Sequence, residues 1–160
     1  GFGHNESVIS LEYLFESIPN AKDFVFTFDC KIFDQVTPEY QQQFIKELIR
    51  IIEKFELQES VFIELRNQEI IEDFITQKPD YKVFALGDFD WAFNIATDLN
   101  LYGISVTDKK VSAEQVSQAH EQGLRVAFYT SNRKSNVIEK NPDYIQTDKL
   151  SYFLNALKPS

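Results

Sequence analysis

The feature that most constrains the fold of this chain is a regular alternation of strand-like and helix-like runs. The first strand-like run, 24–31, is rich in aromatic and β-branched residues, and a helical stripe of apolar residues follows it. The alternation then continues to the end of the chain, with strand-like runs at 24–31, 61–65, 82–86, 101–106, 125–129 and 143–146. Alternation at this spacing predicts right-handed βαβ units and a parallel sheet.

Capping signals mark where the intervening helices begin and end. Thr37 is placed to cap the helix after the first strand, with Pro38 at the first helical position. Ser112 and Gln115 form a capping-box pattern for a helix that stops at Gly123. These signals predict that each strand is followed by a helix of its own.

The number of units predicts an α/β fold, namely an incomplete parallel β/α (TIM-type) barrel. Eight units close such a barrel, typically in about 250 residues, whereas this chain has six units in 160 residues. We therefore expect one domain over 1–160, strands in sequential order, about two units missing, and 1–9 as a flexible or cloning-derived segment. The open edges should be covered by a partner chain, a second copy or the segment 1–9. A reversal in strand order would instead indicate an unrelated open α/β sheet.

Composition excludes several classes of function. The net charge is −9 and the acidic residues are spread along the chain, which argues against binding to a nucleic-acid backbone. No apolar run approaches the roughly 18 residues that a membrane span needs, and no signal peptide is visible. The single cysteine, Cys30, excludes an internal disulfide. We expect a soluble protein, cytoplasmic or exported.

The end of the first strand holds the best candidates for a site, because chemistry in such barrels is located at the carboxyl ends of the strands. Alternation predicts two faces: Phe24, Phe26, Phe28 and Cys30 toward the helices, and Val25, Thr27, Asp29 and Lys31 toward the barrel interior. A carboxylate at the mouth can bind a hard cation, and a lysine can hold a phosphate oxygen. The structural alternative is an ion pair between Asp29 and Lys31.

Other strand ends carry further candidates. Glu64 and Arg66 alternate at the end of the second strand and are expected at the mouth. Glu64 is there either a second carboxylate ligand or an ion-pair partner of Lys31 or Arg66. Tyr129 is placed either to stack on a small organic group or to pack at the rim. Asp148 is interpreted as a helix cap.

The remaining reactive residue types point away from catalysis. His120 precedes Gly123 in a helix and His4 lies near the start, and both are expected at solvated positions. Cys30 should face the helices and lacks a neighbouring base, so a nucleophilic role is not expected. The sequence contains no Gly-rich phosphate loop, HExxH, CxxC or GxSxG motif.

These pieces, in this order, resemble the glycerophosphodiester phosphodiesterase family. Asp29-Cys30-Lys31 resembles the family's strand ending in acid-x-Lys, and 8–12 its entry into the preceding helix. The segment 116–123 resembles its helix followed by Gly, and 125–130 its seventh strand. Asp143-Tyr144-Ile145-Gln146-Thr147-Asp148 resembles its closing Asp-x-Ile-x-Thr-Asp strand. The resemblance covers nearly all of the chain, as the third to eighth units.

The resemblance implies a TIM barrel that hydrolyses small glycerol phosphodiesters to glycerol phosphate and an alcohol, a reaction of lipid metabolism. It implies Mg²⁺ or Ca²⁺ held by three acids, with two histidines as acid and base. Both histidines and two acids belong to the family's first two units, which this chain lacks. Asp29 matches the third acid, usually Glu in the family, with Lys31 beside it, and Tyr129 stands where the family has Trp.

Two functional hypotheses follow from this comparison. In the first, the chain is the C-terminal part of a metal-dependent phosphodiesterase, inactive by itself because it has no complete catalytic site and no complete metal site. In the second, it belongs to a non-catalytic barrel relative that serves as a ligand-binding or interaction module. A His-Arg-Gly segment and an acid-x-acid strand in the upstream coding sequence would favour the first hypothesis.

Overall fold

A computed structural model describes residues 9–32, 36–129, 131 and 134–157. Most of the expected flexible start, residues 1–8, lies outside the described residues. The strands are β1 (Phe26–Asp29), β2 (Val61–Leu65), β3 (Lys82–Leu86), β4 (Gly103–Thr107), β5 (Arg125–Tyr129) and β6 (Tyr144–Ile145). The helices are α1 (Leu11–Ser17), the 3-10 turn η1 (Ala21–Asp23), α2 (Pro38–Lys54), α3 (Gln68–Gln77), α4 (Phe89–Asp98), α5 (Ala113–Glu121), α6 (Lys134–Lys140) and α7 (Leu150–Leu157).

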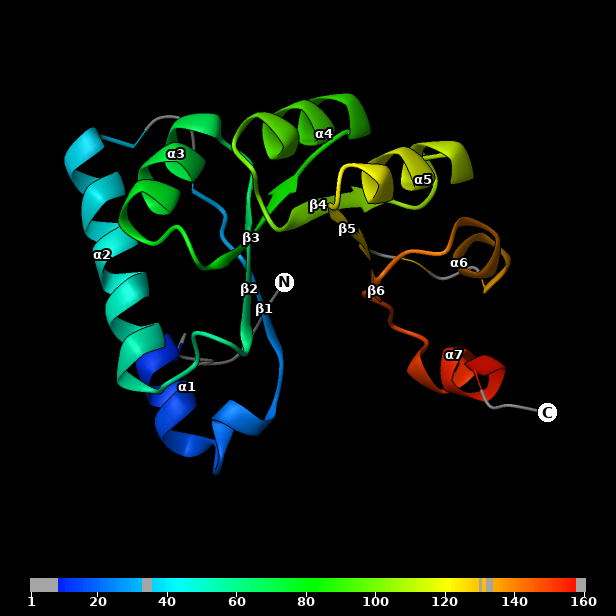
Figure 1. Cartoon of the computed structure of the whole chain (residues 1–160). Coiled ribbons are helices and arrows are strands. Elements are labelled where there is room, and N and C mark those ends of the chain that lie inside the picture. Colours follow the sequence, from blue (N-terminus) through cyan, green and yellow to red (C-terminus); the bar gives the residue numbers. More distant parts are fainter. Residues whose placement is uncertain (1–8, 33–35, 130, 132–133, 158–160) are drawn as a thin grey trace, which may run out of the picture.

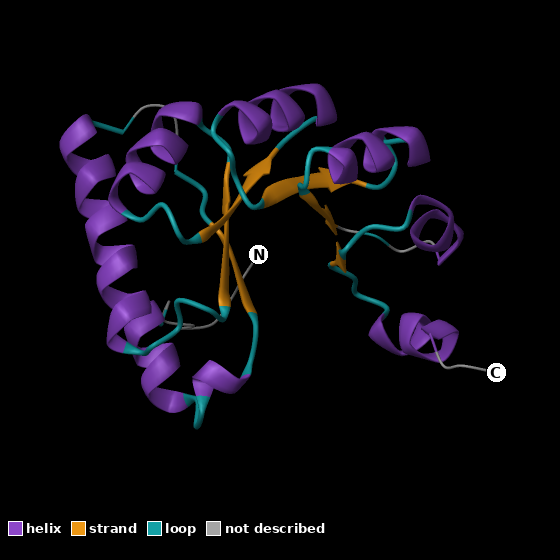
Figure 2. Cartoon of the chain, viewed as in Figure 1, coloured by secondary structure: helices purple, strands orange, loops and turns teal. Residues whose placement is uncertain are grey.

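The strands form one curved parallel sheet in the order β1-β2-β3-β4-β5-β6. The helices lie along the outer side of the curve, and α1 and α7 lie at its two ends (Figures 1 and 2). The predicted parallel, sequential order is confirmed, and the order never reverses as it would in a doubly wound sheet. The architecture is therefore an incomplete parallel β/α barrel of the TIM type.

The predicted caps begin and end the helices as expected. The Thr37 Oγ1 atom accepts a hydrogen bond from Tyr40 N at 3.3 Å. At the start of α5, Ser112 Oγ accepts from Gln115 N while the Gln115 side chain accepts from Ser112 N, which completes a capping box. Three strands differ from their predicted bounds: β1 begins at Phe26 and ends at Asp29, β4 begins at Gly103, and β6 contains two residues. The last strand is short because its pairing with β5 covers only those two residues.

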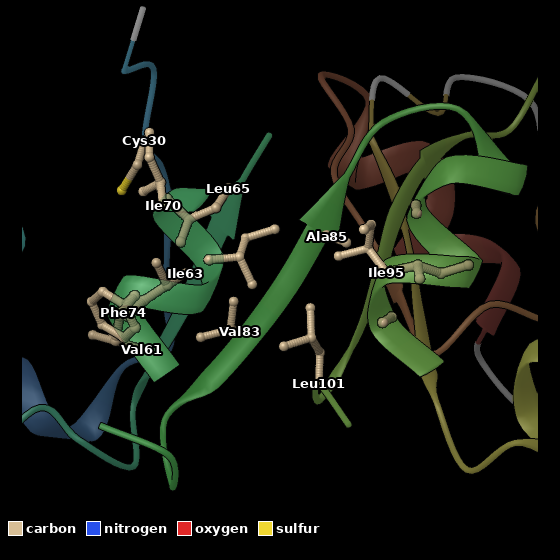
Figure 3. Close-up of a cluster of buried hydrophobic side chains, with 14 of the residues drawn as sticks. Cys30, Val61, Ile63, Leu65, Ile70, Phe74, Val83, Ala85, Ile95 and Leu101 are labelled. Carbon is tan, nitrogen blue, oxygen red and sulfur yellow. The ribbon is translucent and has the colours of Figure 1, made fainter. Parts of the chain in front are cut away.

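The main core lies between the sheet and its outer layer of helices. Figure 3 shows side chains of β2 and β3, including Ile63 and Val83, directed toward Ile70 and Phe74 of α3. These four residues are buried, as is Ile95 of α4. Burial of such apolar surface stabilises the fold by about 25 cal/mol per Å². The helices therefore fix the strands whose far ends form the barrel mouth.

The two faces of β1 follow the predicted alternation, with one exception. Phe26 and Phe28 pack against Phe15 of α1, with ring centroids 5.1 and 5.9 Å away. Thr27 and Asp29 are exposed on the opposite, inner face. Phe24 was expected to face the helices but is 56 % exposed. It precedes the first paired residue of β1, so no neighbouring strand or helix holds it in the core.

Candidate functional site

An aromatic cluster fills the lower part of the barrel interior. Phe62 of β2 and Tyr144 of β6 approach to 4.8 Å between ring centroids, although three strands separate β2 from β6 in the sheet. The Tyr102 and Tyr144 hydroxyls are hydrogen-bonded at 3.0 Å, and burial together with this bond raises the pKa of Tyr144 to about 12. Phe84 packs on the same rings. These contacts cross the interior and hold the two ends of the curve in position.

Glu64 lies above this cluster and is buried, with 2 % exposure. Ser105 Oγ of β4 donates a hydrogen bond to Glu64 Oε1 at 2.6 Å, and Gln146 Nε2 donates to the same oxygen at 3.0 Å. Of the two alternatives for Glu64, the ion pair with Lys31 or Arg66 does not form: its hydrogen-bond partners are neutral side chains from β4 and the end of β6. The curvature of the sheet brings these distant segments together.

Asp29 and Lys31 form the ion pair that was the structural alternative, with Lys31 Nζ 2.7 Å from Asp29 Oδ2. Asp29 is also the ladder partner of Glu64, so two carboxylates lie on adjacent strands at the mouth. The pair is substantially exposed and therefore contributes little to stability. Within the described residues, no group of three or more His, Cys, Asp or Glu side chains could hold a metal ion.

The mouth near β4 and β5 contains a buried carboxylate that the sequence reading missed. Asp108 directly follows β4 and is 1 % exposed. Ser131 Oγ donates to Asp108 Oδ2 at 2.9 Å, and Lys140 Nζ donates to the Asp108 carbonyl at 2.6 Å. The sequence signal for Asp108 was its position directly after a strand. Tyr129, half-buried at the end of β5, pairs with Thr107 in the ladder.

Of the residues that were not expected to be catalytic, His120 lies away from the mouth and the Cys30 thiol is unreactive. His120 was expected to be solvated, but its Nε2 lies 2.9 Å from Asp143 Oδ2 and its side chain is 33 % exposed. This contact is at the opposite end of the barrel, where β5 and β6 begin. Burial, and the nearby Asp29 and Glu64 charges, raise the pKa of Cys30 to about 12. His4 lies outside the described residues.

A pocket of about 540 Å³ also lies at that amino-terminal end, lined by Tyr81, Tyr102 and Arg125 among others. Arg125 is bound there to Asp143. Chemistry in β/α barrels is located at the carboxyl ends of the strands, so the mouth with Asp29 and Glu64 remains the candidate site. Among the described residues, no helix has the length and apolar character to cross a bilayer.

Comparison with known proteins relates this fold to one class of enzyme. No protein-family model matches the chain, and no curated protein sequence matches it. A Silicibacter pomeroyi protein assigned as a glycerophosphoryl diester phosphodiesterase has a similar structure, with a TM-score of 0.73 and 15 % identity over 86 % of this chain and 52 % of that one. A glycerophosphodiester phosphodiesterase from Parabacteroides distasonis gives a TM-score of 0.68 and 17 % identity, over 78 % and 54 %.

A phosphodiesterase from Oleispira antarctica, solved with the product sn-glycerol-3-phosphate, is a third similar structure, with a TM-score of 0.65 and 13 % identity over 76 % of this chain and 51 % of that one. This chain thus spans about half the length of each of the three structures. At these identities the likeness establishes the fold: the chain has the architecture of part of a glycerophosphodiester phosphodiesterase barrel.

Proposed function

We propose that this chain forms the third to eighth units of a metal-dependent, phosphodiesterase-like barrel. The complete barrel hydrolyses glycerol phosphodiesters to glycerol phosphate and an alcohol. The observation that supports this most is the pair Asp29 and Lys31 at the carboxyl end of β1, in a fold that matches half of three phosphodiesterase structures. In this proposal the residues 1–160 form one domain.

The proposal assigns a role to four side chains at the mouth. Asp29 is a ligand of Mg²⁺ or Ca²⁺, with Glu64 as a second carboxylate beside it. Lys31 holds a phosphate oxygen, and Tyr129 packs against the organic part of the substrate. These ions require about six or more oxygen ligands, and the described residues supply two carboxylates on adjacent strands. Carboxylate oxygens are suitable ligands for a hard cation, but two carboxylates are too few to hold it. We therefore assign no catalytic step to this chain alone.

A second candidate function is that of a non-catalytic ligand-binding or interaction module. The observation that favours it is that the polar groups at the mouth are already engaged within the protein. Lys31 contacts Asp29, and Glu64 accepts bonds from Ser105 and Gln146. These contacts provide hydrogen-bond and charge partners for the polar groups without a substrate.

The test is an assay of glycerol phosphate release with added Mg²⁺ or Ca²⁺. We expect no measurable turnover from the 160-residue chain, and metal-dependent turnover once two N-terminal β/α units are joined to it. Asp29→Ala should then lower turnover by about 100-fold or more, because the loss of one ligand weakens the binding of the metal ion. Asp98→Ala, an exposed carboxylate on α4, is the control. Robust turnover by the chain alone would contradict the proposal, and metal or ligand binding without turnover by the joined protein would favour the second function.

We further propose that the two open edges of the sheet, at β1 and β6, are covered in the functional protein. Among the residues that the structure describes, seven large apolar side chains are exposed at the two ends of the curve: Ile9, Tyr13, Phe24 and Val25 near α1 and β1, and Ile138, Leu150 and Tyr152 on α6 and α7. Exposed apolar surface of this kind marks an interaction site. The missing part of the barrel, a partner chain or a second copy are the candidate covers.

A further inference from the structure

Four cationic side chains in the described part of the chain have no partner, although the protein is acidic. The chain has 25 acidic and 16 basic residues. Most of the basic side chains that the structure describes contact a carboxylate or a backbone carbonyl. The described side chains with neither an ion pair nor a hydrogen bond are Lys46, Arg66, Lys109 and Lys149, and all four are exposed.

Three of these four cations follow alternate strands of the sheet. Arg66 directly follows β2, Lys109 lies in the connection from β4 to α5, and Lys149 lies in the connection from β6 to α7. We call these three residues the rim cations. Lys46 differs from them, because it lies on the outer helix α2. The segments that follow the strands form the mouth, where ligands of β/α barrels bind, so the unpaired cations are concentrated at the candidate site.

Hydrogen bonds across the interior hold the ends of β2, β4 and β6 together. Ser105 Oγ of β4 and Gln146 Nε2 after β6 both donate to Glu64 Oε1 of β2, at 2.6 and 3.0 Å. The backbone of Asn67 is extended, with φ −116° and ψ 129°. The alternation of β2 therefore continues through Arg66 and places it on the same face as Glu64. The rim cations thus belong to three segments that converge on one point of the interior.

The exposed carboxylates of the same region do not compensate these cations. Asp29 contacts Lys31 at 2.7 Å, and Asp88 contacts Lys110 at 3.1 Å. In the described connections between strands and helices, the remaining exposed carboxylate is Asp148. The mouth therefore has more exposed cations than carboxylates in these connections, although the whole chain has a net charge of −9. Unpaired guanidinium and ammonium groups bind carboxylates and phosphates.

We propose that the rim cations form a second anion-binding subsite at the mouth, and that the substrate is a glycerol phosphodiester whose alcohol carries a carboxylate or a phosphate. A phosphodiester has a single negative charge, which the proposed function assigns to Lys31, so the rim cations are available for another anionic group. Arg66 is the central member, because its planar guanidinium binds such a group through two parallel hydrogen bonds. The inference rests on the proposed function and adds the class of its substrate.

The first test measures binding by the 160-residue chain itself at low salt, from NMR shifts. Three glycerol phosphodiesters are compared, with choline as a cationic alcohol, ethylene glycol as a neutral one and glycolate as an anionic one. We expect the glycolate diester to bind about 5–10-fold more tightly than the neutral diester, and the choline diester to bind most weakly. The differences should shrink in about 0.5 M salt, because exposed charges are screened. Equal affinities, or no binding of the glycolate diester, would overturn the proposal.

Variants of single cations locate the subsite. Arg66→Gln should remove most of the preference for the glycolate diester, and Arg66→Lys should keep part of it, because the charge remains while the two parallel bonds are lost. Lys109→Gln and Lys149→Gln should each reduce the preference. Lys46→Gln is the matched control, because it removes an unpaired cation from α2 with the same change in net charge. Equal losses in Arg66→Gln and Lys46→Gln would show attraction to the overall charge and would overturn the subsite.

Turnover separates this inference from the proposed function. In the protein with two N-terminal β/α units joined to it, kcat/KM should follow the same order of alcohols, and Arg66→Gln should lower it for the glycolate diester alone. Turnover that ignores the charge of the alcohol would overturn the second subsite and leave the proposed function intact. The same order of binding affinities without turnover would support the subsite and show that the proposed catalytic function is wrong.

Discussion

Asp143 shows how a single carboxylate connects three segments at the amino-terminal end of the barrel. Its Oδ2 accepts a hydrogen bond from Val126 N at 2.8 Å and contacts His120 Nε2 at 2.9 Å, while its Oδ1 accepts from Arg125 at 2.7 Å. Burial by itself would raise the pKa of Asp143, but the bonds from Val126, Arg125 and His120 lower it overall. The ionised form is therefore favoured by the fold.

Replacing Asp143 with Asn should lower the free energy of unfolding by about 1–3 kcal/mol at pH 7, because charge-assisted bonds are lost. The lowered pKa means that this contribution is complete above the unfolded pKa of about 3.9 and is lost as the pH falls through the folded value. Urea unfolding of both proteins at pH 7 and pH 3 measures this. Asp98→Asn is the control, and an equal difference at both pH values would contradict the assignment.

Cys30 should be almost unreactive in the native protein. Its buried thiol has a pKa of about 12, whereas an unfolded cysteine has one of about 8.5. At pH 8 the thiolate fraction, and with it the alkylation rate, should be roughly 10³-fold lower than in urea. Alkylation kinetics with and without urea test this, and native labelling at the unfolded rate would show that the outer face of β1 opens readily.

At the scale of elements, close approach of strands decides which residues the barrel tolerates. Gly103 begins β4 where it lies against β5, and a Cβ atom there would stand 2.2 Å from the Arg125 carbonyl oxygen and 2.8 Å from the Phe84 ring. Gly123 ends the turn after α5 with a φ of 77°, and a Cβ atom there would meet nothing within 4 Å. The two glycines are thus required for different reasons.

These two positions form a matched pair for mutation. Gly103→Ala should lower the free energy of unfolding by about 2–3 kcal/mol, because the backbone of β5 has to move. Gly123→Ala should lower it by about 1 kcal/mol, because only the left-handed backbone is penalised. Urea unfolding of both variants measures the difference. Equal losses would mean that β4 and β5 separate more easily than their contact indicates.

For the whole molecule, contacts across the barrel interior determine how rigidly the curved sheet is held. Phe62 and Tyr144 join β2 to β6 through their rings, and the Tyr102 and Tyr144 hydroxyls join the start of β4 to β6. The last strand has only two residues, so these contacts and the hydrogen bond of Gln146 to Glu64 hold it in place. The position of α7, which follows that strand, depends on the same contacts.

Phe62→Ala should lower the free energy of unfolding by about 2–3 kcal/mol, because it removes an aromatic side chain from a partly buried cluster. The effect should be largest at the far end of the sheet. The amide of Gln146, bonded to Phe128 O at 2.8 Å, should exchange with solvent faster while the amides of β2 stay protected. Tyr40→Ala, at an exposed position on α2, is the control. Unchanged exchange at Gln146 would show that β6 is held by its ladder alone.

The sequence by itself determined the alternation of units, the parallel sequential order and the faces of β1, because these depend on the periodicity and capping of short segments. It also placed Asp29 and Lys31 side by side, since they are two residues apart at the end of the first strand. The partners of Glu64 were decided only by tertiary structure: they lie 41 and 82 residues away and meet because the sheet curves. The same reason explains why the contact of His120 with Asp143, across 23 residues, and the burial of Asp108 were not predicted. Local pattern specifies the elements, whereas curvature and register choose which side chains meet.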